Sequence, residues 1–305
     1  MRVGVTGSSG FIGTALVAAL RERGDVVVRF VRPDSPPTDE PVIRWDPSND
    51  IVDEGDLRRV GHFDAVVNLA GAGIADKRWS PNRKAEISNS RLSATMLLVH
   101  AMHVPGSGSD YVASGSAIGI YGSRDDEPLD ENSSVGSDFL ANICAQWEDV
   151  ARPLETSGTT VSYLRTGIVM SASGGALKKQ LPLFRYGIGG KLSRGNQWTS
   201  PISLVDEVRA ILWAIDHRLA GPLNLVAPES LTNADFTKVL AAQLHRPALL
   251  SVPRFALELV LGRELTRVAV LASQRVAPAA LLASGFAFSH PDVEAILKCS
   301  LSVHN

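Results

Sequence analysis

The chain has 305 residues, of which 45% are hydrophobic and 20% are charged, a composition typical of a globular protein with a full core. The formal net charge of -2 includes no basic excess that would favour nucleic acid, so we expect no nucleic-acid partner. No stretch is long and apolar enough to span a bilayer, and the first residues form a strand pattern rather than a signal peptide, so we expect no membrane partner and a cytoplasmic location.

The first half of the chain alternates short β-type runs with helical patterns. Strands are predicted at residues 2–5, 26–31, 42–45, 64–69, 110–114 and 160–165. Helices are predicted at residues 11–23, 80–103 and 139–155. This alternation indicates parallel βαβ units, and therefore an α/β fold with a Rossmann-like, doubly wound parallel sheet.

The second half is less regular. Residues 171–200 hold many glycines and few periodic runs, which predicts loops over a site. Helices are predicted at residues 204–217, 233–244 and 255–261, a strand at 222–226, and a loop with a last helix within 277–297. We expect residues 1–170 to form the Rossmann domain, which also receives roughly residues 201–226. Residues 171–200 and 227–305 should form a smaller, interleaved substrate-binding lobe.

The cysteines and histidines give no sign of a metal site. The two cysteines, Cys144 and Cys299, are too far apart in the sequence to suggest a disulfide framework or a cysteine-based site. The seven histidines show no HExxH motif and no paired spacing. We therefore expect no metal.

A glycine-rich turn, GSSGFIG at residues 7–13, separates the first strand from the first helix. Gly7 permits a tight turn, Gly10 lets the backbone approach a pyrophosphate, and Gly13 lets the helix pack close to the sheet. The start of the helix offers free N–H groups to the phosphates. The alternative is a tight turn without a ligand. We predict a dinucleotide site built from Gly7, Ser9, Gly10, Phe11, Ile12 and Gly13.

The end of the second predicted strand indicates which cofactor this site would take. Rossmann proteins that bind NAD usually place an acidic residue there for the ribose 2′-hydroxyl, whereas a nearby arginine accommodates a 2′-phosphate. Here the strand is followed by Arg32 and contains no Asp or Glu. A guanidinium can stack on adenine and pair with a phosphate. We favour NADP(H) over NAD(H); the alternative is a solvated surface arginine.

Several stretches resemble a known family. TGSSGFIG at residues 6–13 and VNLAG at 67–71 resemble the extended short-chain dehydrogenase/reductase superfamily. A more specific likeness, to the atypical NAD-dependent epimerase/dehydratase-like branch called "epimerase family protein", covers essentially the whole chain, including a C-terminal segment of the DUF1731 type. It is carried by WDP at 45–47, IADKRW at 74–79, GSDFL at 136–140, LRTGIV at 164–169, GNQW at 195–198, AP at 227–228, QRV at 274–276 and GF at 285–286.

The resemblance implies further cofactor contacts at the ends of the strands. Leu69, Ala70 and Gly71 would line the adenosine and ribose side, and Glu86 and Arg91 would approach the cofactor from the following helix. Thr166, Gly167 and Ile168 would pass near the nicotinamide. Superfamily members often dimerise through the helices after the fourth and fifth strands, which leaves a homodimer open for this chain.

The catalytic pattern of the superfamily is broken. A Tyr-x-x-x-Lys pair normally lies on one helix face, where the lysine lowers the tyrosine pKa for proton transfer. On the corresponding helix, Leu140 falls at the tyrosine position and Cys144 at the lysine position, and neither can do this work. The chain contains no Tyr-x-x-x-Lys at all.

Other polar residues could contribute to catalysis. Ser114 and Ser116, in a serine-rich strand end that resembles the superfamily's, are the candidates for the substrate-binding hydroxyl. Tyr121, Asp138 and Lys77 are the candidate replacements for the missing acid or base. Each has a structural alternative: Tyr121 as packing, Asp138 as a helix N-cap and Lys77 as a solvated charge.

The function remains open between two classes. Lys178, Arg185, Lys191 and Arg194, in the glycine-rich stretch, would suit an anionic small-molecule substrate, although they could equally be solvated loop charges. The favoured hypothesis is an NADP(H)-binding oxidoreductase or epimerase-like enzyme with a non-standard active site. The alternative is a cofactor-binding redox-sensing or regulatory protein without turnover.

Overall fold

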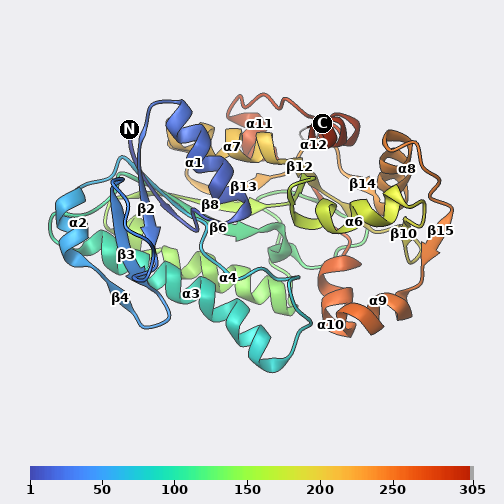
Figure 1. Ribbon diagram of the computed structural model, residues 1–305, viewed down its shortest axis with the longest axis horizontal. Coiled ribbons are helices and arrows are strands. Elements are labelled where there is room, and N and C mark those ends of the chain that lie inside the picture. Colours follow the sequence, from blue (N-terminus) through green and yellow to red (C-terminus); the bar gives the residue numbers. More distant parts are fainter. Residues whose placement is uncertain (303–305) are drawn as a thin grey trace.

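A computed structural model describes residues 1–302 and is built around one eight-stranded sheet (Figure 1). The strand order is β13-β8-β6-β5-β1-β2-β3-β4, and every neighbouring pair is parallel except β3 with β4. The strands are β1 (Arg2–Thr6), β2 (Val26–Val31), β3 (Val42–Asp46), β4 (Ile51–Val52), β5 (Ala65–Asn68), β6 (Tyr111–Ala117), β8 (Thr160–Thr166) and β13 (Gly221–Leu225). The strand order reverses between β1 and β5, and ligands of open α/β sheets bind at such a switch point.

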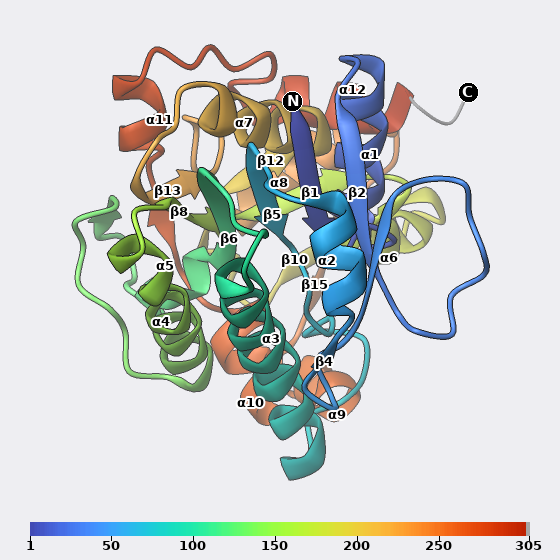
Figure 2. The same ribbon diagram turned by 90° about the vertical axis from the view of Figure 1, so that its left-hand side faces the viewer.

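Helices cover both faces of this sheet (Figure 2). One face packs on α1 (Phe11–Glu22) and α7 (Leu204–Asp216), with Leu16 and Ile211 in its core. The other face packs on α2 (Glu54–Val60), α3 (Pro81–His103), α4 (Phe139–Ala151) and α5 (Pro153–Thr156), with Leu57 and Leu98 in its core. The prediction of a doubly wound α/β fold is therefore confirmed.

The prediction of loops throughout residues 171–200 is wrong. The segment contains α6 (Gly175–Arg185), β10 (Gly190–Leu192) and β11 (Trp198–Thr199), between β9 (Ile168–Ser171) and β12 (Pro201–Ser203). Leu177, Leu181 and Phe184 are spaced by four and three residues, so they share one face of α6 and are buried together. The surrounding glycines concealed this short amphipathic helix in the sequence.

A second, smaller core contains Leu177, Phe236 and Ile296, and a separate small cluster contains Ile120, Leu129 and Val276. The elements outside the main sheet and its helix layers lie mostly in the second half of the chain. They are η1 (Ile118–Tyr121), β7 (Pro128–Leu129), β14 (Leu231–Thr232), α8 (Asn233–Gln243), β15 (Leu250–Val252), α9 (Arg254–Leu261), α10 (Arg263–Leu265), η2 (Thr266–Val270), β16 (Arg275–Val276), α11 (Ala279–Ala283) and α12 (Val293–Ser302). Leu281 and Phe286 belong instead to the core of the main sheet, beside β13. The late part of the chain therefore contributes to both cores.

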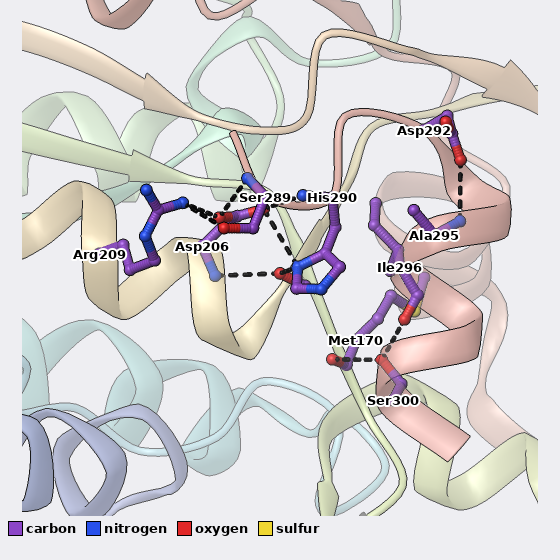
Figure 3. Close-up of polar contacts among 10 residues, drawn as sticks. Met170, Asp206, Arg209, Ser289, His290, Asp292, Ala295, Ile296 and Ser300 are labelled. Atoms are coloured by element: carbon purple, nitrogen blue, oxygen red, sulfur yellow. Dashed lines mark hydrogen bonds and ion pairs between the residues drawn. The ribbon is translucent and has the colours of Figure 1, made fainter. Parts of the chain in front are cut away.

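A buried carboxylate fastens the segment before α12 to the start of α7 (Figure 3). Asp206 accepts hydrogen bonds from the backbone N–H groups of Ser289 at 3.0 Å and His290 at 2.7 Å, and it pairs with Arg209 at 2.7 Å. Further along, Ser300 donates to the carbonyl of Met170 at 3.0 Å. The described helices include none that is long and apolar enough to cross a membrane.

Candidate functional site

The glycine turn has the backbone geometry of a phosphate cradle. Gly7 has a φ of +62°, and a Cβ at this position would lie 2.6 Å from the carbonyl oxygen of Leu69. A Cβ on Gly13 would lie 2.1 Å from the oxygen of Gly7, so the helix approaches the turn closely only because Gly13 has no side chain. Gly10 is the N-cap of α1, and no side chain within residues 1–302 caps this helix. The first N–H groups of α1 therefore remain available to an anion.

A cavity of about 880 Å3 adjoins this turn and runs past the end of β2 to the middle of α3, where residues 86–94 line it. It joins the predicted residues Gly7, Ser9, Arg32, Ala70, Gly71 and Glu86. Leu69, Gly10, Phe11, Ile12 and Gly13 flank the turn without lining the cavity. Residues that the sequence reasoning missed also line it: Arg29, Ser35, Thr38, Trp45, Ser48, Asn89, Ser90 and Ser93.

Two arginines stand at the β2 end of the cavity. The Nη1 atom of Arg32 lies 2.5 Å from Oδ1 of Asp46, and the Arg32 side chain is 57% exposed. Arg29 pairs with Glu40 at 3.0 Å, and its buried Nε has no partner within residues 1–302. A hydrogen bond from Asn49, together with Arg32, keeps the pKa of Asp46 below its usual value. The carboxylate is therefore anionic at neutral pH and orients Arg32.

A buried polar chain fixes the turn that follows β5. Thr6 donates to Asn68 at 2.7 Å, and the Thr6 hydroxyl accepts the backbone N–H groups of Leu69 and Ala70 at 3.1 and 3.2 Å. Asn68 in turn donates to Thr95 on α3 at 2.9 Å. Thr6 and Asn68 end two adjacent strands. Polar residues at these two strand ends, beside the switch point, are the signal by which the sequence could have indicated this contact.

Glu86 and Arg91 were both expected to face the cofactor from α3, but only Glu86 lines the cavity. Glu86 lines the cavity and pairs with Arg83 at 2.7 Å, which keeps the pKa of Glu86 below its usual value. Arg91 instead donates to the carbonyls of Ala72 and Ile87, both at 2.9 Å, and is not among the residues that line the cavity. Burial lowers the pKa of Arg91. Its observed contacts serve to hold the turn after β5 against α3.

Gly167 and Ile168 follow the carboxyl end of β8, next to an unexpected buried acid. Glu207, in the first turn of α7, accepts a hydrogen bond from the Thr166 hydroxyl at 2.8 Å. Its second oxygen has no partner in the described part of the chain. Burial raises the pKa of Glu207 to about 8, against the effect of the Thr166 bond. The burial of Glu207 was not predictable from the sequence, because acidic residues at a helix start are usually explained by the helix dipole.

The three candidate catalytic residues are buried. Ser114 is inaccessible, and its hydroxyl has no partner within residues 1–302. Ser116 donates to Glu148 at 2.7 Å. Tyr121 is also inaccessible; its hydroxyl donates to Asn224 at 2.7 Å, and burial raises its pKa to about 12. The burial and bonding of Tyr121 match its structural alternative and argue against direct contact with a substrate.

The positions that carry Tyr and Lys elsewhere in the superfamily are buried on α4. Leu140 and Cys144 are 8% and 5% exposed, and burial raises the pKa of Cys144 to about 12. The thiol is therefore protonated and inert at neutral pH. Asp138 caps α4 by accepting the backbone N–H of Ala141 at 3.0 Å, as its structural alternative predicted.

Residues 74–79 connect the first half of the chain with the second. Asp76 approaches Lys179 of α6 at 3.6 Å, and Arg78 donates to the carbonyl of Leu259 in α9 at 3.3 Å. Trp79 packs edge-on against Phe139, the residue before Leu140, with ring centroids 5.1 Å apart. This segment therefore lies at the start of α4, between the sheet helices and the smaller core.

The predicted cations are on the surface. Lys77, Lys178, Arg185, Lys191 and Arg194 are exposed, and none of them forms an ion pair within residues 1–302. Within the same residues, no group of His, Cys, Asp and Glu side chains is arranged to hold a metal ion.

Comparisons with known proteins agree with this architecture. Residues 3–144 match the NAD dependent epimerase/dehydratase family, and residues 252–298 match a domain of unknown function, DUF1731. An epimerase family protein of Mycobacterium leprae is 40% identical over 289 residues, which cover 94% of this chain and 92% of the relative. The epimerase family protein SDR39U1 of Homo sapiens is 35% identical over 303 residues, which cover 98% and 99%.

Solved structures show the same likeness. The crystal structure of human SDR39U1 (isoform 2) with NADPH has a TM-score of 0.88 and 33% identity, and the match covers 99% of both chains. MoeE5 in complex with UDP-glucose and NAD has a TM-score of 0.76 at 21% identity, covering 99% of this chain and 98% of that one, which shows a shared fold alone. The full-length likeness and the two family matches show that this chain belongs to the epimerase family proteins, an atypical branch of the extended short-chain dehydrogenases/reductases.

Proposed function

We propose that this protein is an NADP(H)-dependent oxidoreductase or epimerase-like enzyme whose acid–base groups differ from the usual Tyr and Lys. The observation that carries the proposal is that one cavity contains both the glycine turn and the two arginines Arg29 and Arg32. The two ends suit the pyrophosphate and the 2′-phosphate of one dinucleotide. The NADPH in the crystal structure of the human relative supports the same cofactor here.

Different residues around the cavity would bind different parts of the cofactor. The backbone of the glycine turn would hold the pyrophosphate, Ala70 and Gly71 the ribose side, and Arg32 the 2′-phosphate. We also retain Gly167 and Ile168 as neighbours of the nicotinamide, since they follow the carboxyl end of β8, and ligands of open α/β sheets bind outside the carboxyl ends of the strands. Bound NADP(H) would give or take a hydride there.

The proton in such a reaction would need a donor other than Tyr and Lys, because Leu140 and Cys144 occupy those positions. The hydroxyls of Ser116 and Tyr121 are already engaged with Glu148 and Asn224. Ser114 is the candidate whose hydroxyl has no partner in the described chain, so it is the one free to bind a substrate oxygen if the surrounding residues open. We propose residues 171–200 and 227–305 as the lobe that selects the substrate, a small and anionic molecule.

The alternative is a cofactor-binding sensor without turnover, and the buried Leu140 and Cys144 favour it. Nicotinamide absorbance followed against a panel of sugars, aldehydes and quinones separates the two. Turnover that Ser114→Ala reduces, with NADPH binding unchanged, supports the enzyme. Tight NADPH binding without turnover on any of the panel supports the sensor. Absence of NADPH binding refutes both.

Superfamily members often dimerise through the helices that correspond to α3 and α4, which pack side by side in this chain. We propose a homodimer through these two helices. Light scattering of the purified protein tests it, because a monomer mass at micromolar concentration would contradict the proposal.

A further inference from the structure

Helix α9 has an apolar surface that nothing in the described chain covers. Six of its eight residues, RFALELVL, are apolar, yet none of the eight is buried. Phe255, Leu259 and Val260 are 73%, 74% and 72% exposed. Phe255 and Leu259 are four residues apart and therefore share one face of the helix. Large apolar side chains gathered in this way usually mark an interaction site.

The apolar surface continues onto the neighbouring elements. Leu249 and Leu250, just before α9, are 93% and 53% exposed, and Tyr186 at the end of α6 is 83% exposed. Strands β10 and β15 pair with Gly190 opposite Leu250, and this pairing brings the end of α6 close to the chain before α9 (Figure 1). We call these six residues, three on α9 and three beside it, the α9 patch.

The charges around the α9 patch are positive, in a chain whose net charge is -2. Residues 245–267 hold four arginines and only two glutamates. Glu258 is paired with Arg254 at 2.6 Å and Glu264 with Lys84 at 2.7 Å, so both carboxylates are neutralised locally. Arg246 and Arg267 are exposed and form no ion pair within residues 1–302.

Exposed Phe, Leu and Val residues on a short helix flanked by arginines are the features of a segment that lies in a membrane interface. The apolar side chains would enter the boundary between headgroups and acyl chains, and the arginines would meet anionic headgroups. A second copy of this chain fits less well, because a two-fold contact would set the same arginines against each other. We propose that the α9 patch docks this protein on the surface of an anionic phospholipid bilayer.

This docking concerns the surface of a bilayer and requires no spanning helix. It also places residues 74–79 beside the membrane, since Arg78 contacts the carbonyl of Leu259. The proposal stands on the exposed residues and their charges, and it does not depend on which cofactor or reaction the protein uses.

The test is flotation of the full chain with vesicles of phosphatidylcholine, alone or mixed with phosphatidylglycerol. We expect binding to the mixed vesicles alone, and binding that weakens as salt rises. Phe255→Glu and Leu259→Glu should each reduce binding about tenfold or more, because each removes a large apolar side chain from the interface. Leu282→Glu, which makes the same change at an exposed apolar residue of α11, is the matched control and should bind as the unmutated protein does.

Other outcomes would overturn the proposal. Unmutated protein that does not float with the mixed vesicles refutes it, and so does an equal loss of binding in Leu259→Glu and Leu282→Glu. Light scattering of the same samples tests whether a second copy of this chain covers the α9 patch instead. A dimer that Leu259→Glu converts to a monomer, with no vesicle binding, would assign the patch to a second copy of the chain.

Discussion

The guanidinium of Arg165 on β8 meets the carboxylate of Glu148 on α4 in a two-point contact, with Nε to Oε1 and Nη2 to Oε2 both 2.9 Å. Both side chains are 9% exposed. Burial opposes the charge of Arg165, but its bonds to Glu148 and Tyr121 outweigh this effect and raise its pKa. The pair joins the helix that carries Leu140 and Cys144 to the strand that ends at the expected nicotinamide site.

Removal of one partner should destabilise the fold strongly. In Glu148→Gln, Arg165 would remain buried without its counter-charge, and breaking a buried pair in this way costs about 3 kcal/mol or more. Denaturant unfolding at neutral pH measures the change. Asp149→Asn, at the next residue and in an exposed pair with Arg152, should leave unfolding nearly unchanged. Equal losses in the two variants would show that burial of the pair is unimportant.

The sequence predicted the strand–turn–helix unit because its requirements are local. Backbone that must approach a phosphate leaves glycines at fixed spacing, and Gly7 and Gly13 have the close contacts that this spacing implies. The parallel sheet with helices on both faces likewise followed from alternating patterns. For Asp138, local rules offered an N-cap as the alternative to a catalytic role, and the structure shows this cap.

Features that depend on tertiary contacts were not predictable from the sequence. Arg91 was expected at the cofactor, but two backbone carbonyls hold it elsewhere. The hydroxyl of Tyr121 is occupied by Asn224, which is 103 residues away in sequence. The sequence identified α9 as amphipathic, which normally implies a buried face, whereas none of its residues is buried.

Arg32 should determine the choice of cofactor. We expect NADPH to raise the melting temperature of the unmutated protein more than NADH does at equal concentration, because a ligand that binds only the folded state stabilises it. Arg32→Glu would place a second carboxylate beside Asp46 and repel the 2′-phosphate, weakening NADPH binding about tenfold or more, or about 1.4 kcal/mol. Arg58→Glu on α2, at another exposed arginine, is the control. Equal shifts with NADPH and NADH before mutation would refute the role of Arg32.

Alanine at Gly10 and at Gly13 should have different effects. A Cβ on Gly10 meets only the oxygen of Gly7, at 3.1 Å, so Gly10→Ala should fold normally but obstruct the pyrophosphate and weaken NADPH binding. A Cβ on Gly13 would lie 2.1 Å from that oxygen, so Gly13→Ala must move backbone and should cost about 1–3 kcal/mol. Thermal unfolding without cofactor, followed by NADPH titration, compares them. A Gly13→Ala protein as stable as Gly10→Ala would contradict the close approach of turn and helix.

Glu207 should make stability fall as pH rises. Burial raises its pKa to about 8 in the folded protein, against an ordinary value of 4.5 in an unfolded chain, so the folded state binds one more proton between these two pH values. The contribution is fully present below pH 4.5 and is lost as pH rises through 8, with a slope of at most about 1.4 kcal/mol per pH unit. Glu207→Gln keeps the shape of the side chain but cannot ionise. The free energy of unfolding of this variant, relative to that of the unmutated protein, should therefore increase as pH rises across this window. Chemical unfolding at pH 5, 6, 7 and about 8 measures the difference, since proton linkage appears as this slope.

The control for this prediction is Glu22→Gln, on the exposed side of α1, which should leave the pH dependence as it is in the unmutated protein. A constant difference between Glu207→Gln and the unmutated protein at every pH would mean that the buried carboxyl does not take up a proton on folding.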